Sequence, residues 1–198
     1  AAKLTKLDKD RLVTAGFIPG DVYGYANTLY NWGWVFGGEF YKYQTGKLSI
    51  NHPRNVKALE WMQTYAKKYG FRHYTTFTSG FGSGEIQPFY MDKLGITVKY
   101  YGEILNIEKF APKLDYSIAS LPAPEGGEKD SSWVGGWCIA IPKGCKNPDE
   151  AFEFMRWLCT TKEGTEAINQ STFMLPGWKK APCFARLRAN PKHKIFID

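Results

Sequence analysis

The chain has 198 residues, of which 43% are hydrophobic and 16% aromatic, which is ample for one packed domain or two small ones. Its formal net charge is +7, but the lysines are scattered apart from short pairs such as Lys67-Lys68 and Lys179-Lys180, so we favour a solvated surface over a nucleic-acid interface. No apolar run approaches the roughly 18 residues of a membrane span, and no charged-then-apolar leader opens the sequence.

The first ring-rich stretch covers residues 21–38. Residues 21–31 have the pattern of one or two helical turns, and they lead into a segment that contains Trp32 and Trp34. If that segment is extended, the two indoles share a side. If it is helical, they do not.

Residues 53–69 form the clearest predicted helix. A brief strand at 47–50 precedes it, Asn51 or His52 is expected to cap it, Pro53 opens it and Gly70 ends it. Its predicted apolar face consists of Val56, Leu59, Met62, Ala66 and Tyr69.

The middle of the chain alternates short elements. Residues 77–86 form a glycine-containing loop that lacks the flanking strand and helix of a nucleotide site. Alternating Leu94, Ile96 and Val98 predict a strand at 94–99 with one buried face. We further expect a short helix at 106–110, a strand at 115–121 and, at 122–132, the longest polar Pro/Gly-rich linker.

The stretch from 131 to 160 is the best-defined part of the second half. A buried strand is predicted at 137–141, followed by a helix at 148–159 that Asn147 caps and Glu150 supports through a capping box. Its apolar stripe, expected to be buried, contains Ala151, Phe154, Met155 and Leu158. Thr160 or Thr161 is expected to cap a further helix through Asn169. These elements predict an α/β fold.

The cysteines and histidines show no metal-binding spacing. Cys138, Cys145, Cys159 and Cys183 include no C-x-x-C pair, so we expect no zinc site and no other cofactor. Cys138 lies in the predicted strand and Cys159 beside the predicted helical stripe, where buried thiols behave as small hydrophobes. Whether any of the four forms a disulfide stays open.

Two function classes compete at the level of residue chemistry. Glu39, Glu85, Glu103 and Glu108 are candidate acids for a glycan hydrolase, but no catalytic signature accompanies them. The seven tryptophans and twelve tyrosines are typical of a binding module, because a sugar's apolar face packs on flat rings while polar groups meet its hydroxyls.

Four segments, in order, resemble family 1 extracellular solute-binding proteins, the sugar receptors of ABC importers. They are FGGEFY, TGKLSIN and ALEWM within residues 36–70, QPFYMDKLGITV at 87–98, KFAPKLDYSIASLPAPEGG at 109–127 and the strand and helix at 135–158. The resemblance implies a two-lobed periplasmic-binding-protein-like fold of type II. The chain is shorter than the family's usual length, so we expect a fragment that contains mainly one lobe and the hinge crossing.

By this resemblance, residues 1–131 form an α/β portion like the C-terminal lobe, and residues 132–198 form the hinge strand and the helices that return toward the other lobe. The implied ligand-binding residues are Trp32, Trp34, Tyr100, Tyr101, Gly136 and Trp137. The family often reads Asn-Gly-x-Trp after the strand at 94–98, whereas this chain has Lys99-Tyr100-Tyr101-Gly102. Either a tyrosine supplies the stacking ring here, or the pocket is shaped for a different sugar.

The implied function is to bind a mono- or oligosaccharide in an interlobe cleft and deliver it to the permease subunits of an ABC transporter, without chemistry on the ligand. The implied location is extracytoplasmic, with membrane association only through a lipid anchor or the permease. The alternatives are a standalone carbohydrate-interaction or adaptor domain and, less favoured, the glycan hydrolase.

Overall fold

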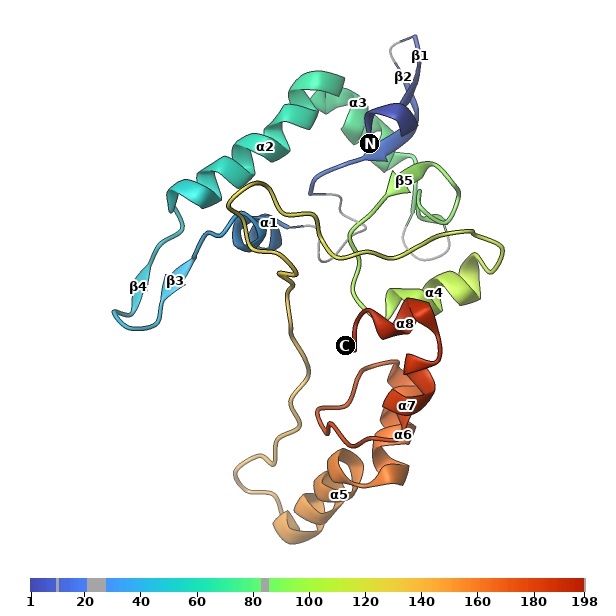
Figure 1. Cartoon of the computed structure of the whole chain (residues 1–198). Coiled ribbons are helices and arrows are strands. Elements are labelled where there is room, and N and C mark those ends of the chain that lie inside the picture. The colour runs from blue at the N-terminus through green and yellow to red at the C-terminus, as the bar shows by residue number, and fades with distance from the viewer. Residues whose placement is uncertain (10, 21–27, 83–85, 198) are drawn as a thin grey trace. The chain divides into compact units, whose positions relative to one another are not determined.

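The computed structural model of the chain describes residues 1–9, 11–20, 28–82 and 86–197. Contacts divide them into two compact units, Ala1–Trp133 (unit 1) and Val134–Asp198 (unit 2). Every strand among the described residues lies in unit 1, whereas the regular elements of unit 2 are all helices (Figure 1). None of the helices that the structure describes is long and apolar enough to cross a membrane.

A three-stranded sheet forms the centre of unit 1. Its strands are β1 (Lys6–Asp8), β2 (Arg11–Phe17) and β5 (Leu94–Ile96), in the order β1-β2-β5, and a short 3-10 helix, Ala2–Leu4, precedes β1. β1 pairs antiparallel with β2, and β5 pairs parallel with β2. β5 is shorter than the predicted strand at 94–99, and Ile96 is exposed where burial was predicted, because β2 is the only described strand beside β5.

Four helices of unit 1 surround this sheet: α1 (Leu29–Val35), α2 (Pro53–Tyr69), α3 (Phe71–Ser79) and α4 (Glu103–Phe110). The prediction of α2 is confirmed. His52 is its N-cap, and the side chain accepts a hydrogen bond from the Arg54 amide, while Gly70 ends the helix at φ 84°. α3 was not predicted, and it occupies the first part of the expected loop at 77–86.

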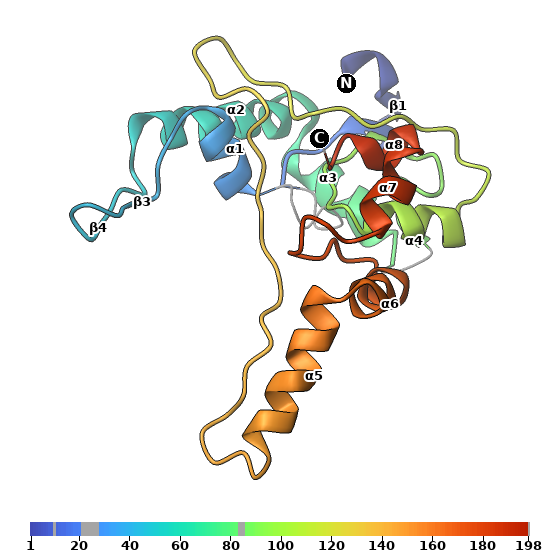
Figure 2. The same ribbon diagram turned by 60° about the horizontal axis from the view of Figure 1, so that its bottom comes forward.

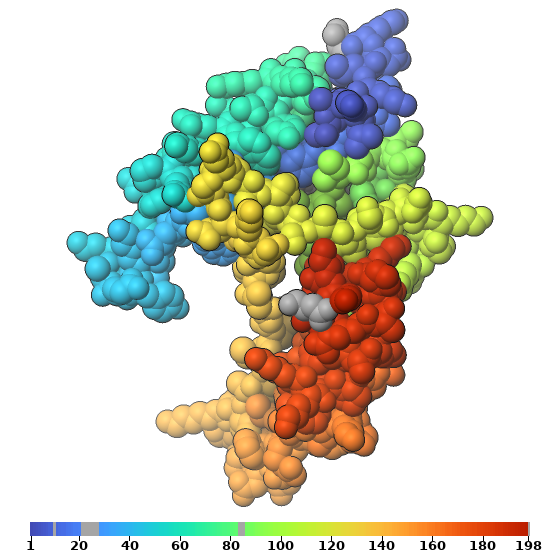
Figure 3. Space-filling view, in the orientation of Figure 1, coloured from blue at the N-terminus to red at the C-terminus, as the bar shows by residue number. Residues whose placement is uncertain are grey.

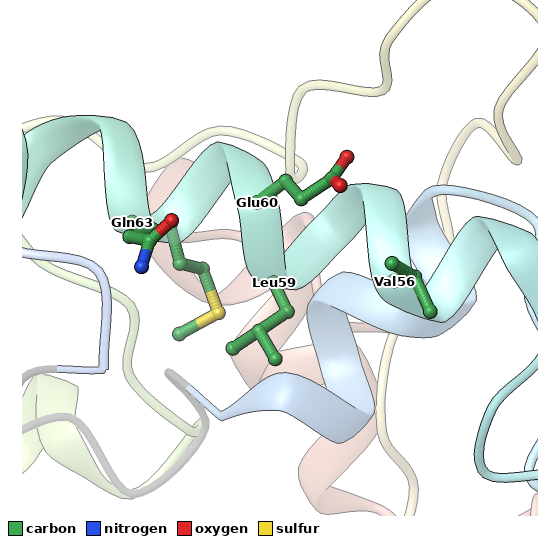
Figure 4. A pocket seen from close by; sticks show the side chains of 5 residues that line it. Val56, Leu59, Glu60 and Gln63 are labelled. Atoms are coloured by element: carbon green, nitrogen blue, oxygen red, sulfur yellow. The ribbon is translucent and has the colours of Figure 1, made fainter.

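The buried face of α2 agrees only in part with the predicted one, of which Met62 and Tyr69 are partly buried and pack against the apolar core. Val56 and Leu59 are exposed, whereas Asn55 and Ala58 are buried. The Asn55 amide accounts for the burial of its side of the helix, because it donates hydrogen bonds to the carbonyls of Glu39 (2.8 Å) and Ile50 (3.1 Å). Figure 4 shows Val56 and Leu59 lining a hollow of about 370 Å³ along α2.

A hairpin precedes α2. Its strands are β3 (Tyr41–Lys42) and β4 (Lys47–Leu48), with Tyr41 opposite Leu48. The predicted brief strand at 47–50 is therefore present as Lys47–Leu48. In the space-filling view of Figure 3 the hairpin stands clear of the other elements of unit 1.

Two apolar clusters hold unit 1 together. The first joins β2 and β5 to α3 through Leu12, Ala15, Tyr74, Phe77 and Leu94, with Ile18 beside them. The second joins the end of β2 to α1 and α2 through Phe17, Trp32, Val35, Ala58 and Val98. The second cluster therefore brings the residues after β5 to the side of α1.

Unit 2 contains α5 (Pro148–Thr160), α6 (Lys162–Thr172), α7 (Cys183–Arg188) and α8 (Pro191–Lys194). The predicted helices at 148–159 and from Thr161 onward are confirmed, and Thr161 caps α6 by accepting a hydrogen bond from the Gly164 amide. Asn147 stands at the N-cap of α5 but makes no side-chain capping bond, so the predicted capping box is absent. Figure 2 shows α5 lengthwise.

The predicted strand at 137–141 is wrong. These residues are irregular and largely exposed, because a strand requires a neighbour for its backbone hydrogen bonds and no described strand pairs with them. The predicted burial of the α5 stripe fails for the same reason. No residue of α5 is buried, since unit 2 offers no described sheet for the stripe to pack on.

Other predictions have mixed outcomes. The short helix expected at 106–110 begins earlier, at Glu103, and the strand expected at 115–121 is irregular chain with no strand partner among the described residues. The helical turns expected at 21–31 fall mostly on residues 21–27, which lie outside the described residues. All four cysteines are free thiols in the structure, and Cys138 and Cys159 are exposed rather than buried.

Candidate functional site

The carboxyl ends of the parallel strands β2 and β5 define one edge of the sheet. β2 ends at Phe17 and leads toward α1, and β5 ends at Ile96 and leads through residues 97–102 into α4 (Figure 1). In open α/β sheets, ligands bind outside this edge, because the loops there can converge on a ligand without breaking the sheet. The predicted site residues of unit 1 all follow these two strands.

Trp32 and Trp34 lie on α1, and the helix sends their rings in different directions. Trp32 is only 3% exposed, and its ring lies 4.6 Å from Trp61 and 6.0 Å from Phe17 between centroids. Trp34 is half-buried and lies on another side of the helix. The helical alternative for these residues is therefore the one observed, and Trp32 is a core residue in this structure.

Trp34 belongs to a partly exposed group of three rings, which we call the aromatic surface: Tyr30, Trp34 and Phe40. The Tyr30 and Phe40 centroids are 4.8 Å apart, and Phe40 meets Trp34 edge-on at 6.0 Å. Tyr30 is 59% exposed. Such a group offers flat apolar faces together with a phenol hydroxyl, the combination that packs on a sugar ring.

The second group of predicted residues lies in the loop between β5 and α4. Tyr100 is 43% exposed and Tyr101 is half-buried. The Tyr100 ring lies over Gly102, where an added Cβ would stand 2.7 Å from Cε2 of that ring. Glycine at 102, the departure from the family pattern, thus leaves the space that the Tyr100 ring occupies.

A buried polar network anchors the loop between β5 and α4 on its inner side. Lys99 Nζ lies 3.2 Å from Glu103 Oε1 and donates a hydrogen bond of 2.6 Å to Gln87 Oε1. Glu103 also accepts hydrogen bonds from the Tyr90 hydroxyl and, at 3.2 Å, from Asn106 Nδ2. Because Lys99 and Glu103 flank the two tyrosines and are held on the inside, Tyr100 stays toward the solvent.

The network leads to a prediction about alkaline stability. Burial raises the pKa of the Tyr90 phenol above its ordinary value of about 10, and the hydrogen bond to Glu103 raises it further. Because the pKa of Tyr90 is higher in the folded chain, the unfolded chain releases this proton first as the pH rises. The protonated phenol therefore contributes its full stability below about pH 10 and loses it at higher pH. We expect urea midpoints of Tyr90→Phe to decline less steeply above about pH 10 than those of the wild type.

Tyr43→Phe is the matched control, since the Tyr43 ring is 88% exposed on the hairpin. This variant should keep the wild-type slope. Equal slopes for Tyr90→Phe and the wild type would show that Tyr90 does not supply the alkaline dependence.

Gly136 and Trp137 lie in unit 2, in irregular chain. Both are exposed, and the Trp137 indole reaches 84% exposure. The Trp137 ring therefore makes no core contribution within the described residues. A large indole left in water is available to a ligand or to another protein surface.

The hollow on α2 is a poorer candidate. Its lining consists of Val56, Leu59, Glu60, Met62 and Gln63, which provide no aromatic ring. Within the described ranges, His, Cys, Asp and Glu side chains form no group of three or more that could hold a metal ion.

Sequence reasoning missed several residues around the site. Glu103 appeared only as one of several acids, and Phe40 was not singled out. No local pattern marks Glu103 as buried, because its partner Tyr90 comes from another segment. The sequence offered one signal for Phe40, since it lies two residues after Gly37-Gly38, and Gly37 has a positive φ.

Comparison with known proteins identifies the fold and the family of the chain. A probable ABC transporter-binding protein of Deinococcus radiodurans is 26% identical over 145 residues, which is 71% of this chain and 33% of that protein. Structures of CpMnBP1 with mannobiose and with mannotriose bound match all of this chain with TM-scores of 0.81 and 24% identity. Those matches show that the fold is periplasmic-binding-protein-like.

The chain spans a third of the curated relative and about half of each solved structure. The family model described as bacterial extracellular solute-binding protein matches residues 2–194. The relatives are binding proteins rather than enzymes. With almost the whole chain matched, it belongs to the bacterial extracellular solute-binding protein family.

Proposed function

We propose that the chain is part of the sugar-binding component of an ABC importer and that it holds a mono- or oligosaccharide in a cleft between two lobes. In this proposal residues 1–131 supply most of one lobe, and residues 132–198 supply the hinge crossing and the return toward the other. Family membership, the ABC-transporter name of the curated relative and the mannobiose and mannotriose of the structural neighbours support it.

The observation that carries the proposal is the placement of exposed rings after β2 and β5. The aromatic surface on one side and Tyr100 on the other follow the two parallel strands at their carboxyl ends. An apolar ring face binds a pyranose through its C–H groups, while hydroxyl groups at the rim are met by polar atoms. Trp34 and Tyr100 are therefore the proposed stacking rings of unit 1, and Tyr101 borders them.

Gly102 supports Tyr100 over Tyr101 for this role. The ring of Tyr100 lies over the glycine and is the more exposed of the two. In unit 2, Gly136 and Trp137 are the proposed hinge contacts, because the bare indole of Trp137 needs a cover that the described residues do not provide.

The proposed mechanism is closure of the two lobes around the sugar, after which the permease subunits recognise the closed form. The proposed location is extracytoplasmic. Membrane association would come from a lipid anchor or from the permease. The described site holds binding groups, and the protein's proposed role involves no bond making or breaking in the ligand.

Calorimetry with mannobiose and mannotriose tests the proposal. In a protein that joins this chain to a second lobe, Trp34→Ala and Tyr100→Ala should each weaken binding by about 2 kcal/mol, the usual cost of removing an aromatic anchor. Tyr43→Ala, a ring on the projecting hairpin, is the control that should bind as the wild type does. Unchanged affinity in both site variants would refute the placement of the site.

The 198-residue chain alone should bind these sugars weakly or not at all, because one wall of a cleft excludes little water. Binding by the chain alone that equals the two-lobed protein's would identify it as a complete module. That result would favour the standalone carbohydrate-interaction domain instead.

A further inference from the structure

Two glycine pairs that sugar stacking does not use, Gly37-Gly38 and Gly126-Gly127, come into the same neighbourhood of unit 1. The first directly follows α1, and the second lies in the linker at 122–132. Figure 1 shows the yellow linker passing beside α1 and the beginning of α2. One glycine of each pair, Gly37 and Gly126, lies against the same side chain, that of Arg54 in the first turn of α2.

Arg54 bridges the two segments. Its Nη1 donates a hydrogen bond of 2.7 Å to the Gly126 carbonyl and a longer one of 3.4 Å to the Phe36 carbonyl at the C-cap of α1. Beside it, the Glu128 amide donates a hydrogen bond of 2.9 Å to the Val35 carbonyl, the last residue of α1. The linker and a cation together therefore satisfy the carbonyls at the carboxyl end of α1.

The glycines are needed for this approach. A Cβ at Gly37 would collide with the Arg54 guanidinium, and a Cβ at Gly127 would collide with the Val35 carbonyl oxygen. Gly37 and Gly126 also have φ values of 78° and 71°, a region that side chains rarely adopt. The close contact between the end of α1, Arg54 and the linker therefore requires glycine at positions 37 and 127.

α1 depends on external contacts for its orientation. It has seven residues, and isolated helices shorter than about 12 residues are marginal in water. Its carboxyl end is attached through Val35 and Phe36, and Trp34 of the aromatic surface is the adjacent residue. A change in the attachment therefore changes where the Trp34 ring lies.

We propose that Arg54, Gly37 and Gly127 form a clasp that fastens the linker to the end of α1, and that Arg54 is a positioning residue coupling Trp34 to the segment leading out of unit 1. The hydrogen bonds of Arg54 and of the Glu128 amide support the clasp. Its effect on sugar binding depends on the proposed function. Movement of the linker during lobe closure would be transmitted to the Trp34 ring through three hydrogen bonds.

Amide hydrogen exchange of the 198-residue chain tests the clasp without any ligand. In Arg54→Met, which keeps the length of the side chain but removes its donors, the Glu128 amide should exchange about tenfold faster or more. Amides of α2, and that of its C-cap Gly70 with its bond to the Ala66 carbonyl, should keep their wild-type rates. Arg54→Lys, with a single ammonium in place of the fork, should fall between the two.

Arg72→Met is the matched control, since it removes the same charge from an exposed position in α3. It should leave the Glu128 amide unchanged. An unchanged Glu128 amide in Arg54→Met overturns the clasp. Equal acceleration throughout α2 also overturns it, because Arg54 would then be a general stabilising residue.

Mannotriose binding by the two-lobed protein tests the coupling to Trp34. Arg54→Met should weaken this binding about fivefold to tenfold, although Arg54 is not placed against the sugar. Faster exchange of the Glu128 amide together with unchanged mannotriose affinity would show that the clasp holds only the linker, and it would refute the coupling to Trp34. If the wild type binds no sugar, the proposed function fails while the exchange result still decides the clasp.

Discussion

Trp32→Ala should lower the free energy of unfolding of the chain by about 3–5 kcal/mol, the range observed when a large buried aromatic is truncated. The Trp32 indole is almost completely buried and joins Phe17 of β2 to Trp61 of α2. Its loss leaves a cavity where three elements meet, and rigid elements close over such a cavity only in part. Urea unfolding followed by circular dichroism measures the change.

Trp34→Ala is the comparison, since it removes the same side chain two residues further along the same helix. Trp34 is half-buried, so this variant should lose clearly less stability, and its main effect should be on sugar affinity. If the two variants lost the same stability, the assignment of Trp32 to the core and Trp34 to the surface would be wrong.

Glu103→Ala should be comparably destabilising, by about 3–5 kcal/mol, because it leaves a buried cation without its counter-charge. The side chains of Lys99 and Glu103 are only 9% and 4% exposed. The substitution also removes the acceptor for the Tyr90 hydroxyl and for Asn106. Thermal unfolding at neutral pH measures the loss.

The double variant Lys99→Met/Glu103→Leu separates charge from volume. It removes both charges and keeps apolar bulk, so it should recover much of the stability that Glu103→Ala loses. A double variant no more stable than Glu103→Ala would show that the cost comes from packing or from the Tyr90 hydroxyl rather than from the lost counter-charge of Lys99.

Elements defined by local signals could be predicted from the sequence. α2 has the predicted bounds because a cap, a proline and a terminal glycine all act within one or two turns of the backbone. α5 and the start of α6 follow from the same kind of signal at Asn147-Pro148 and Thr161. α3 lacks such a signal, since it begins directly after Gly70 and contains β-branched threonines that lower helix propensity.

Features defined by distant partners could not be predicted in this way. Residues 137–141 have a strand's composition, and α5 has a helical stripe, but both need a sheet that no described part of unit 2 supplies. The buried side of α2 was predicted only in part, because the hydrogen bonds of Asn55 hold its side of the first turns inward and leave Val56 and Leu59 exposed. The apolar periodicity of a sequence identifies a helix or strand, whereas its tertiary contacts decide which face is buried.

The candidate site shows the same division. Ring-bearing segments could be recognised by composition, and the proposed stacking rings, half-buried Trp34 and exposed Tyr100, lie after β2 and β5. Which indole faces inward depends on the helical turn of α1, and this was left open between two conformations. The aromatic partners of Trp34 and the buried partners of Lys99 come from separate segments, so only the folded chain reveals them.

The parallel pairing of β2 with β5 has a consequence for how the chain folds. Ala15 pairs with Leu94, so the sheet closes only after all of the intervening chain, including α1, α2 and α3, has been synthesised and gathered. Loop-closure entropy must be overcome before such a pairing contributes any stability, and domains with distant pairings fold slowly for their size. α2, with its strong local signals, can form transiently long before. During that interval the edge of β2 is exposed to other chains, and refolding at low protein concentration should therefore favour the native sheet over aggregation.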